Sequence, residues 1–322
     1  MLEQDRSESQ VESKEQIRMM LLIDSHYLGY QALYTQEGLS YHDIQTGVLY
    51  GFLARILSLG QFFETNNLVF CWDSKTSLRK KAFKGYKQKR QDNRTEEEKE
   101  KTRIAHEQFT LLRREILPAM GFRNCLIQKG LEADDVIAKT AEVELGDKII
   151  VSADEDFYQC LAPNLRIWNP SKKRMMTLRK FSDSYGITPK QWIMVKQIAG
   201  CSSDCVPGVR GIGEVFAIRY IRHTLPPHTK RYKSIKANEE TIIARNAGLV
   251  TLPHPKTKRQ QIQATTFSSS GFKRVCKKYG FHSFLQPEQY KAWLDFMSGT
   301  ANHKGGYNEY GTRKERRRTT RN

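Results

Sequence analysis

The sequence of 322 residues has few cysteines and no long apolar run. Its six cysteines are scattered, and no second pair accompanies Cys201 and Cys205 at a spacing suited to zinc. No secretory signal is recognisable, so we expect a reducing compartment, most simply the cytoplasm, and no stabilising disulfides. No apolar stretch is long enough to span a bilayer, and no basic helix has a large apolar face. These absences argue against a secreted disulfide scaffold, a zinc protein and a membrane protein.

Acidic residues are also in short supply. Asp and Glu together number 35 against 53 Lys and Arg, which gives a formal net charge of +18. A basic surface attracts polyanions and steers their diffusional capture. The composition therefore predicts a nucleic-acid-binding protein, and local clusters of acid within it need a separate explanation.

Three of the acids follow short apolar runs. Each run stops at an aspartate: Met19–Ile23 at Asp24, Leu68–Trp72 at Asp73 and Ile149–Ala153 at Asp154. Continuous apolar runs of this length are typical of strands buried on both faces of a parallel sheet. Ligands bind at the carboxyl ends of such strands, where three carboxylates would repel one another unless a cation neutralised them. A divalent metal site is therefore the first hypothesis, although each aspartate taken singly could be a helix cap or turn residue.

More carboxylates lie close by in the sequence. Glu132, Asp134 and Asp135 open a helical pattern, in which Glu132 and Asp135 share one face and Asp134 lies on the adjoining flank. Capping of that helix would use only one or two of them. Asp156 points in the same direction as Asp154 if the chain there is extended. Oxygen ligands without a His or Cys partner favour Mg²⁺ or Mn²⁺ over zinc.

The pattern of elements predicts an α/β core over residues 18–180. The apolar run Val48–Leu57 has the length of a helix and lies between the first two strands, which gives a β-α-β beginning. Leu165–Trp168 is expected to form a further strand. Residues 1–17 are charged and poor in bulky apolar side chains, so we expect a disordered lead-in to the first strand.

A basic segment interrupts this core from Lys75 to about Arg103. Two aromatic residues, Phe83 and Tyr86, lie among its cations, which are Arg79, Lys80, Lys81, Lys84, Lys87, Lys89 and Arg90. Cations neutralise a nucleic-acid backbone, and aromatic rings stack on the bases of single strands. The alternative is a solvated, mobile charged segment without a binding role.

Residues 181–300 are expected to form a second, helical region. A helix at Gln191–Ala199 leads into a stretch with Gly208, Gly211 and Gly213, and another helix follows. Glycines let backbone amides approach a phosphate, and the missing strand before them argues against a dinucleotide fold. We expect a hairpin clamp on a nucleic-acid backbone, the alternative being a purely structural turn.

Two segments complete the chain. Tyr290–Met297 is expected to be an apolar helix that packs back on the core. Residues 301–322 form a basic tail, which either keeps the chain soluble or tethers nucleic acid without sequence preference.

Six short motifs occur along the chain in a characteristic order. They are Leu22-Ile23-Asp24, Phe70-Cys71-Trp72-Asp73, Tyr86-Lys87-Gln88-Lys89-Arg90, Glu132-Ala133-Asp134-Asp135, Ser152-Ala153-Asp154-Glu155-Asp156 and Pro207-Gly208-Val209-Arg210-Gly211-Ile212-Gly213. In order and spacing the chain resembles the flap endonuclease and 5′-3′ exonuclease family, in particular its bacteriophage members and the 5′-nuclease domain of bacterial DNA polymerase I. The resemblance covers about residues 19 to 255, and six ordered motifs are far more specific than any single one.

The resemblance implies a fold and an activity. The fold would be an α/β, PIN-like nuclease core with a mostly parallel central sheet, a helical arch at about residues 75–103 and a helix-three-turn-helix module that grips duplex DNA. The activity would be that of a structure-specific 5′-nuclease on DNA with 5′ flaps, nicks or RNA/DNA primers. Two Mg²⁺ or Mn²⁺ ions would serve a two-metal mechanism, and a monovalent cation would sit at the hairpin clamp. Single-strand-binding or replication proteins are implied partners, and the protein itself would be a monomer.

The same resemblance implies roles for individual residues. The metal ligands, or the anchors behind them, would be Asp24, Asp73, Glu132, Asp134, Asp135, Asp154, Asp156 and Asp204. Lys87 and Arg90 would contact the scissile phosphate. Further contacts to DNA would come from Arg79, Tyr86, Gly208, Arg210, Gly211, Ile212 and Gly213.

One position departs from the family pattern. Family members commonly carry two aspartates in a Gly-Asp-x-x-Asp stretch before the hairpin, and here Cys201 takes the first place while Asp204 keeps the second. A thiol replaces a hard oxygen ligand poorly, so we expect weaker affinity for the second metal ion. Two alternatives stay open: a junction-DNA-binding protein without turnover, and a PIN-type ribonuclease.

Overall fold

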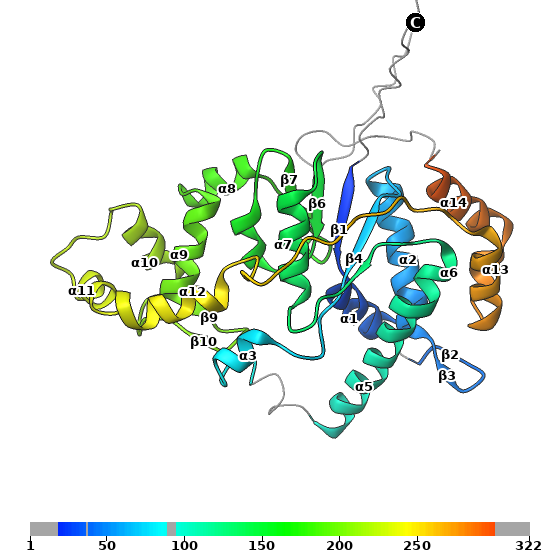
Figure 1. The fold of residues 1–322 in the computed structure, drawn as a ribbon, viewed down its shortest axis with the longest axis horizontal. Coiled ribbons are helices and arrows are strands. Elements are labelled where there is room, and N and C mark those ends of the chain that lie inside the picture. Colours follow the sequence, from blue (N-terminus) through cyan, green and yellow to red (C-terminus); the bar gives the residue numbers. More distant parts are fainter. Residues whose placement is uncertain (1–18, 37, 89–94, 300–322) are drawn as a thin grey trace, which may run out of the picture.

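The centre of the fold is a six-stranded sheet (Figure 1). The computed structural model describes residues 19–36, 38–88 and 95–299. Across the sheet the strands are β5 (Cys125–Leu126), β4 (Leu68–Cys71), β1 (Met20–Asp24), β6 (Lys148–Val151), β7 (Leu165–Asn169) and β8 (Arg174–Met176). Neighbouring strands pair in parallel except β7 and β8, which are antiparallel. The predicted α/β class with a mostly parallel sheet is confirmed.

The three strands predicted from apolar runs lie side by side in the middle of this sheet. β1 lies between β4 and β6, with Ile23 opposite Phe70 on one side and Val151 on the other. All residues of the three strands are buried. Alternate side chains enter different hydrophobic clusters, as Leu21 and Leu22 do. Because the strands are parallel and aligned, their carboxyl ends meet at one edge of the sheet.

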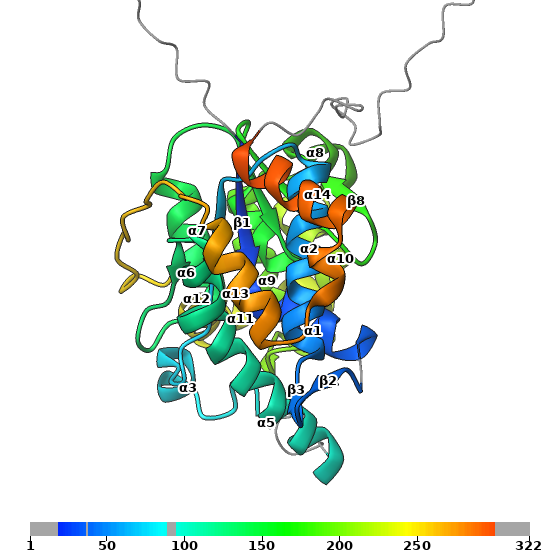
Figure 2. The same ribbon diagram turned by 90° about the vertical axis from the view of Figure 1, so that its right-hand side faces the viewer.

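Helices cover both faces of the sheet (Figures 1 and 2). One face packs against α1 (Ser25–Thr35), α2 (Gly47–Phe62), α5 (Glu96–Leu111), the π-helical turn η1 (Leu112–Ile116), α6 (Leu117–Met120), α13 (Ser269–Lys278), η4 (His282–Leu285) and α14 (Pro287–Ser298). The other face packs against α7 (Ala133–Val143), the 3₁₀ helix η2 (Glu155–Cys160) and α9 (Pro189–Ala199). A small hairpin of β2 (Ser40–Tyr41) and β3 (Ile44–Gln45) connects α1 to α2.

The apolar helix expected at residues 290–297 is part of α14 and packs back on the core, as predicted. Trp293 and Phe296 are buried in the same cluster as α2. A Cβ atom on Gly60 of α2 would lie 2.0 Å from the ring of Phe296, so the contact requires a glycine at this position. The C-terminal helices thereby complete the core on the first face of the sheet.

The remaining helices extend one side of the molecule (Figure 1). They are α8 (Leu178–Tyr185), α10 (Glu214–Ile221), α11 (Lys230–Ala237), the π-helical turn η3 (Glu239–Ile243) and α12 (Ala244–Val250). The predicted helix Gln191–Ala199 corresponds to α9, which begins two residues earlier. Its side chains share one hydrophobic cluster with the sheet. A division of the chain into domains near residue 180 therefore stays a prediction.

The basic segment lies at the carboxyl edge of the sheet, where α3 (Leu78–Ala82) and α5 extend below it (Figure 1). In α5 several cations pair with glutamates of the same helix, as Lys99 does with Glu96 and Arg103 with Glu100. The predicted lead-in at 1–17 and the basic tail at 301–322 lie outside the described residues. Among the helices of the described ranges, none combines the length and the apolarity needed to cross a membrane.

Candidate active site

Four carboxylates gather at the carboxyl edge of the sheet. Asp24 ends β1, Asp73 and Asp154 follow β4 and β6, and Asp134 lies in the first turn of α7. Burial raises the pKa of Asp24 to about 7, and the charges of Asp73 and Asp154 contribute to the rise. Burial also raises the pKa of Asp134 well above its usual range, with a further contribution from the charges of the other three. We call these four residues the acidic group; their mutual repulsion would be relieved by a cation.

Two aspartates of the acidic group also cap helices. Oδ1 of Asp24 accepts a hydrogen bond from the amide of Tyr27 (3.0 Å), while Oδ2 accepts one from Oγ of Ser152 (3.0 Å). Oδ1 of Asp154 accepts one from the amide of Asp156 (2.8 Å) at the start of η2. A carboxylate has about four lone-pair sites, so capping fixes its orientation and still leaves sites for a ligand. The capping and metal interpretations are therefore compatible.

Asp73 is fixed by α7 and by His26, a residue that sequence analysis did not single out. Oδ1 of Asp73 accepts a hydrogen bond from the amide of Ala133 (2.7 Å). The amide of Asp73 donates to Nδ1 of His26 (3.1 Å), and burial lowers the pKa of this histidine. An imidazole that accepts at Nδ1 is neutral and carries its proton on Nε2. In the sequence, His26 could have been identified as a neighbour of the site from its position two residues after Asp24.

A second group of ligand atoms lies next to the acidic group. One atom each of Asp156, Cys201 and Asp204 lies within 4.8 Å of the other two, and we call these residues the thiol group. Its proximity to the acidic group is shown by the charge of Asp156, which raises the pKa of Asp154. Burial raises the pKa of the Cys201 thiol to about 11, with contributions from both aspartates. The sulfur is therefore protonated at neutral pH unless a metal ion displaces the proton.

Two lysines already compensate the carboxylates of the thiol group. Nζ of Lys196 lies 3.0 Å from Oδ1 of Asp156 and 3.0 Å from Oε1 of Glu214. Nζ of Lys87 lies 3.8 Å from Oδ2 of Asp204. Burial lowers the pKa of both lysines, but the neighbouring carboxylates outweigh it and raise the pKa above its usual value. Both side chains are therefore charged, and this group holds less uncompensated negative charge than the acidic group.

Lys196 was not among the predicted site residues, because the prediction considered the carboxylates and not the cations that would neutralise them. The signal was present in the helical spacing, since Lys196 follows the buried Trp192 by four residues on the predicted helix. Its Nζ lies 5.5 Å from the centre of the Trp192 ring. A lysine on the buried face of a helix needs an anionic partner. Asp156 is such a partner for Lys196.

Lys87 lies between the two groups. Its Nζ donates a hydrogen bond to Oε2 of Glu132 (2.8 Å), and its amide donates to the carbonyl of Asp204 (2.8 Å). Its φ of +55° is a left-handed conformation that a lysine rarely adopts, so the surrounding contacts hold it there. The hydroxyl of Tyr86 donates to the same Oε2 of Glu132 (2.9 Å) and lies 3.1 Å from Oδ2 of Asp204. Tyr86 is only 2% exposed here, and the stacking of its ring on a base stays a prediction.

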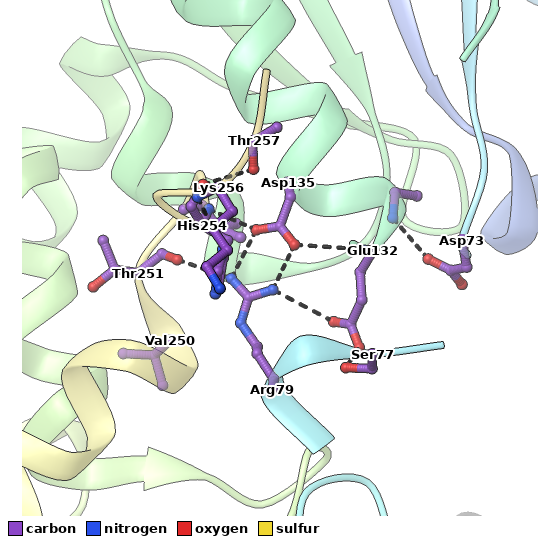
Figure 3. Close-up of polar contacts among 12 residues, drawn as sticks. Asp73, Ser77, Arg79, Glu132, Asp135, Val250, Thr251, His254, Lys256 and Thr257 are labelled. Atoms are coloured by element: carbon purple, nitrogen blue, oxygen red, sulfur yellow. Dashed lines mark hydrogen bonds and ion pairs between the residues drawn. The ribbon is translucent and has the colours of Figure 1, made fainter. Parts of the chain in front are cut away.

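A buried ion pair joins α3 to α7 (Figure 3). The guanidinium of Arg79 forms two hydrogen bonds with the carboxylate of Asp135, at 2.6 and 2.7 Å. Asp135 also accepts from the amides of His254 (2.8 Å) and Glu132 (3.2 Å), and Arg79 donates to the carbonyl of Thr251 (2.9 Å). The network therefore connects three parts of the chain that are far apart in the sequence.

This network bears on two predicted roles. Arg79 is 3% exposed and its guanidinium is bonded to Asp135, so a contact of this side chain with DNA would have to replace those bonds. Asp135 is fully buried and bonded through both oxygens, a position suited to an anchor behind the metal ligands. The roles of both residues stay predictions.

The glycine-rich hairpin follows β9 (Gly200–Cys201) and β10 (Val206–Pro207). A Cβ on Gly208 would lie 2.2 Å from the backbone at the end of α9, so this glycine permits close packing. Gly211 has φ +75°, Gly213 precedes α10, and around both a Cβ would meet open space. Arg210, Gly211 and Gly213 are exposed, whereas the side chain of Ile212 is buried. Any contact of Ile212 with DNA would therefore use its backbone.

Arg90, the second predicted phosphate contact, lies outside the described residues.

Comparison with known proteins agrees with this geometry. The model of the 5′-3′ exonuclease family, covering its N-terminal resolvase-like domain, matches residues 19–186. This is more than half of the 322 residues, and the chain belongs to the 5′-3′ exonuclease family.

The relatives differ in how much of their length this chain spans. Thermostable DNA polymerase I of Thermus thermophilus is 33% identical over 208 residues, which are 63% of this chain but only 24% of the polymerase. The chain thus spans about a quarter of that relative. The 5′-3′ exonuclease of Buchnera aphidicola subsp. Schizaphis graminum is 26% identical over 261 residues, 79% of this chain and 83% of the relative.

A solved structure shares the fold. The flap endonuclease D15 of bacteriophage T5, in a complex with DNA and metal ions, superposes with a TM-score of 0.62 at 20% identity. The superposition covers 88% of this chain and 100% of D15. The predicted PIN-like fold class is confirmed.

Proposed function

We propose that this protein is a structure-specific 5′-nuclease that hydrolyses phosphodiesters of DNA at junctions of single and double strands. The observation that carries the proposal is the acidic group, in which burial and the neighbouring carboxylates raise the pKa of Asp24 and of Asp134 beside the protonated Lys87. Buried carboxylates that destabilise one another have little use in binding DNA alone, but they are suited to holding cations against a phosphate. Membership of the 5′-3′ exonuclease family supports the same activity.

The residues present fit hard divalent ions. The acidic group offers only oxygen donors, and the pKa of Asp134 stays raised although the charge of Lys87 lowers it, which favours Mg²⁺ or Mn²⁺ as a further source of positive charge. The thiol group would hold a second ion less tightly, because its carboxylates are paired with lysines and its sulfur is protonated. When bound, the ions would activate a water molecule and stabilise the leaving oxygen.

The protein's own groups would orient the substrate. Lys87 keeps its proton beside Glu132 and Asp204, so its ammonium can bind a phosphate oxygen and offset charge that develops there. Arg90 is proposed for a similar contact on family resemblance. At the hairpin, the exposed Arg210 and the amides of Gly211 and Gly213 would bind the backbone of duplex DNA, with a monovalent cation as a possible ligand there.

The proposed substrates are DNA with a 5′ flap or nick and RNA/DNA primers. A junction fits the arrangement in which α3 of the basic segment and the strands β9 and β10 lie side by side (Figure 1), with Lys87 in contact with Asp204 and close to Asp134 of the acidic group. We further propose that the protein acts as a monomer in the cytoplasm, together with single-strand-binding or replication proteins.

The first test is cleavage of a labelled 5′-flap DNA and a matching RNA/DNA hybrid in Mg²⁺, Mn²⁺ or EDTA. We expect metal-dependent cuts near the junction and a loss of at least about a hundredfold in rate for Asp154→Asn, because this change removes a charge from the acidic group. The matched control is Asp147→Asn, an exposed aspartate that precedes β6 at the opposite end of the same strand. Tight junction binding without cleavage in either metal would contradict the proposal and indicate a binding protein instead.

A further inference from the structure

A pocket opens beside the acidic group. It has a volume of about 650 Å³ and is formed where the carboxyl ends of β6 and β7 meet β8 and α8. Asp154 belongs both to its wall and to the acidic group. The basic segment, the hairpin and the thiol group contribute none of the lining residues. The pocket is therefore contiguous with the candidate active site, but it is built from different elements.

The rim of the pocket is cationic. It contains Lys172 and Lys173 from the turn between β7 and β8, Arg174 at the start of β8, and Lys180 from α8. Three carboxylates also line it: Asp154, Glu155 and Asp183. Glu155 pairs with Lys172 at 3.9 Å, and Asp183 pairs with Arg179, outside the pocket, at 3.9 Å. The four cations outnumber the three carboxylates, so the balance of charge on the rim is positive.

The turn that carries two of these cations and leads into Arg174 is held in place. The amide of Lys172 donates to Oδ1 of Asn169 (3.0 Å). Oγ of Ser171 lies 2.7 Å from the hydroxyl of Tyr27 and accepts a hydrogen bond from the side-chain Nε2 of Gln31 (2.5 Å). Tyr27 and Gln31 both lie on α1. Because the backbone of the turn is fixed, its side chains start from defined positions, which lowers the entropic cost of binding an anion.

The inner wall of the pocket is aromatic. Tyr158 and Tyr185 line it, with ring centres 6.1 Å apart. Behind them, the ring of Trp192 packs 5.5 Å from Tyr158 and 4.9 Å from Tyr185. Aromatic faces beside cations suit a ligand that has both a planar ring and a phosphate.

We propose that this pocket binds a nucleotide, with its phosphate at Lys172 and Arg174 and its base or sugar against Tyr158 and Tyr185. In the proposed nuclease, on which this part of the inference rests, the nucleotide belongs to the cut strand and lies next to Asp154 of the acidic group. The same chemistry would also accept a free 5′-mononucleotide such as a product of the reaction. The pocket would thus be a third site that positions the strand, besides the acidic group and the basic segment.

The test compares Lys172→Ala, Arg174→Ala and the double variant with Arg166→Ala. Arg166 is a matched control because it is a cation on β7 that pairs with Asp147, outside the pocket. Binding of labelled flap DNA is measured by fluorescence anisotropy in EDTA over a range of salt concentrations. Each pocket variant should weaken binding about three- to tenfold and reduce the salt slope by about one per lost phosphate contact. Arg174→Lys should restore much of the slope, and Arg166→Ala should behave as the unmodified protein does.

A second arm distinguishes the two sources of the nucleotide. Binding of dTMP is followed by ligand-observed NMR with the same variants. Weaker DNA binding in the pocket variants supports a strand site, whereas unchanged DNA binding with lost dTMP binding supports a site for free nucleotide. Unchanged binding of both ligands in the double variant would overturn the inference. Because no turnover is needed, a pocket that binds DNA in a protein without cleavage activity would refute the nuclease and not the pocket.

Discussion

At the scale of single residues, Cys201 is expected to weaken metal binding at the second site. Its protonated thiol lies within 4.8 Å of ligand atoms of Asp156 and Asp204, where a hard cation would prefer a third oxygen. We expect Cys201→Asp to tighten Mg²⁺ binding at the second site on the order of tenfold, because a charged oxygen ligand is added. Isothermal titration with Mg²⁺ at neutral pH would measure this as a lower Kd.

The control for this prediction is Cys205→Ser, which changes a half-buried thiol in the same hairpin but outside the thiol group. It should leave the Mg²⁺ titration unchanged. If Cys201→Asp gave the same stoichiometry and affinity as the unmodified protein, the thiol would be inconsequential for metal binding.

The sequence predicted which carboxylates lie together better than it predicted their surroundings. Asp24, Asp73 and Asp154 could be placed together because an apolar run of a parallel strand determines where its next residue lies. The ion pairs of Lys196 and Arg79 were not predicted, because both depend on which way a side chain of a helix points in the tertiary structure. Electrostatic partners far apart in the sequence leave no periodic signal.

At the scale of elements, the ion pair between Arg79 and Asp135 attaches α3 to α7. Breaking a buried pair leaves an uncompensated charge, so Arg79→Met should lower the free energy of unfolding by about 3–5 kcal/mol. In Arg79→Met/Asp135→Asn the leftover charge is gone, and the double variant should lose clearly less than the sum of the two single changes. Urea denaturation of the four proteins would measure this double-mutant cycle.

Additive losses would show that the two side chains contribute independently, in conflict with the contacts of 2.6 and 2.7 Å between them. As a reference, Arg103→Met removes a cation that pairs with Glu100 on the exposed face of α5. Its loss should be below about 1 kcal/mol, because water screens exposed pairs.

Elements with a strong local pattern were predicted well, and those set by tertiary contacts were not. β1, β4 and β6 agree with their apolar runs to within one or two residues. The antiparallel strand β8 was not expected, since Arg174–Met176 is short and lies at the sheet edge without a characteristic alternation. The hairpin of β9 and β10 was not predicted, because its residues lie in a stretch with the composition of a glycine-rich loop.

At the scale of the whole molecule, the acidic group opposes folding when no metal is bound. The carboxyl of Asp24 has a pKa of about 7 in the folded protein against 3.8 normally, so the folded state binds this proton more tightly than the unfolded state. Stability from this group is present at low pH and is lost as the pH rises from about 4 to about 7. At about 1.4 kcal/mol per pH unit, the upper limit of the loss is about 4 kcal/mol.

The matching experiment compares Asp24→Asn with the unmodified protein in EDTA by thermal unfolding. The variant should be more stable by up to about 4 kcal/mol at pH 8, with the gain vanishing near pH 4. Adding Mg²⁺ at pH 8 should reverse the order, because the metal stabilises the carboxylate and not the amide. Asp147→Asn, at an exposed position, should show neither effect. A variant less stable than the unmodified protein in EDTA at pH 8 would contradict the electrostatic account.

The attachment of the ion pair between Arg79 and Asp135 to Thr251 and His254 has a consequence for how the chain can be shortened. The family match ends at residue 186, yet Asp135 within it is satisfied by backbone some seventy residues beyond that end, and α2 needs α14 to cover Gly60. A fragment that ended at residue 186 would leave Asp135 without the amide of His254 and the surface of α2 around Gly60 without the ring of Phe296. Truncation at the limit of the family match would therefore expose both surfaces to water.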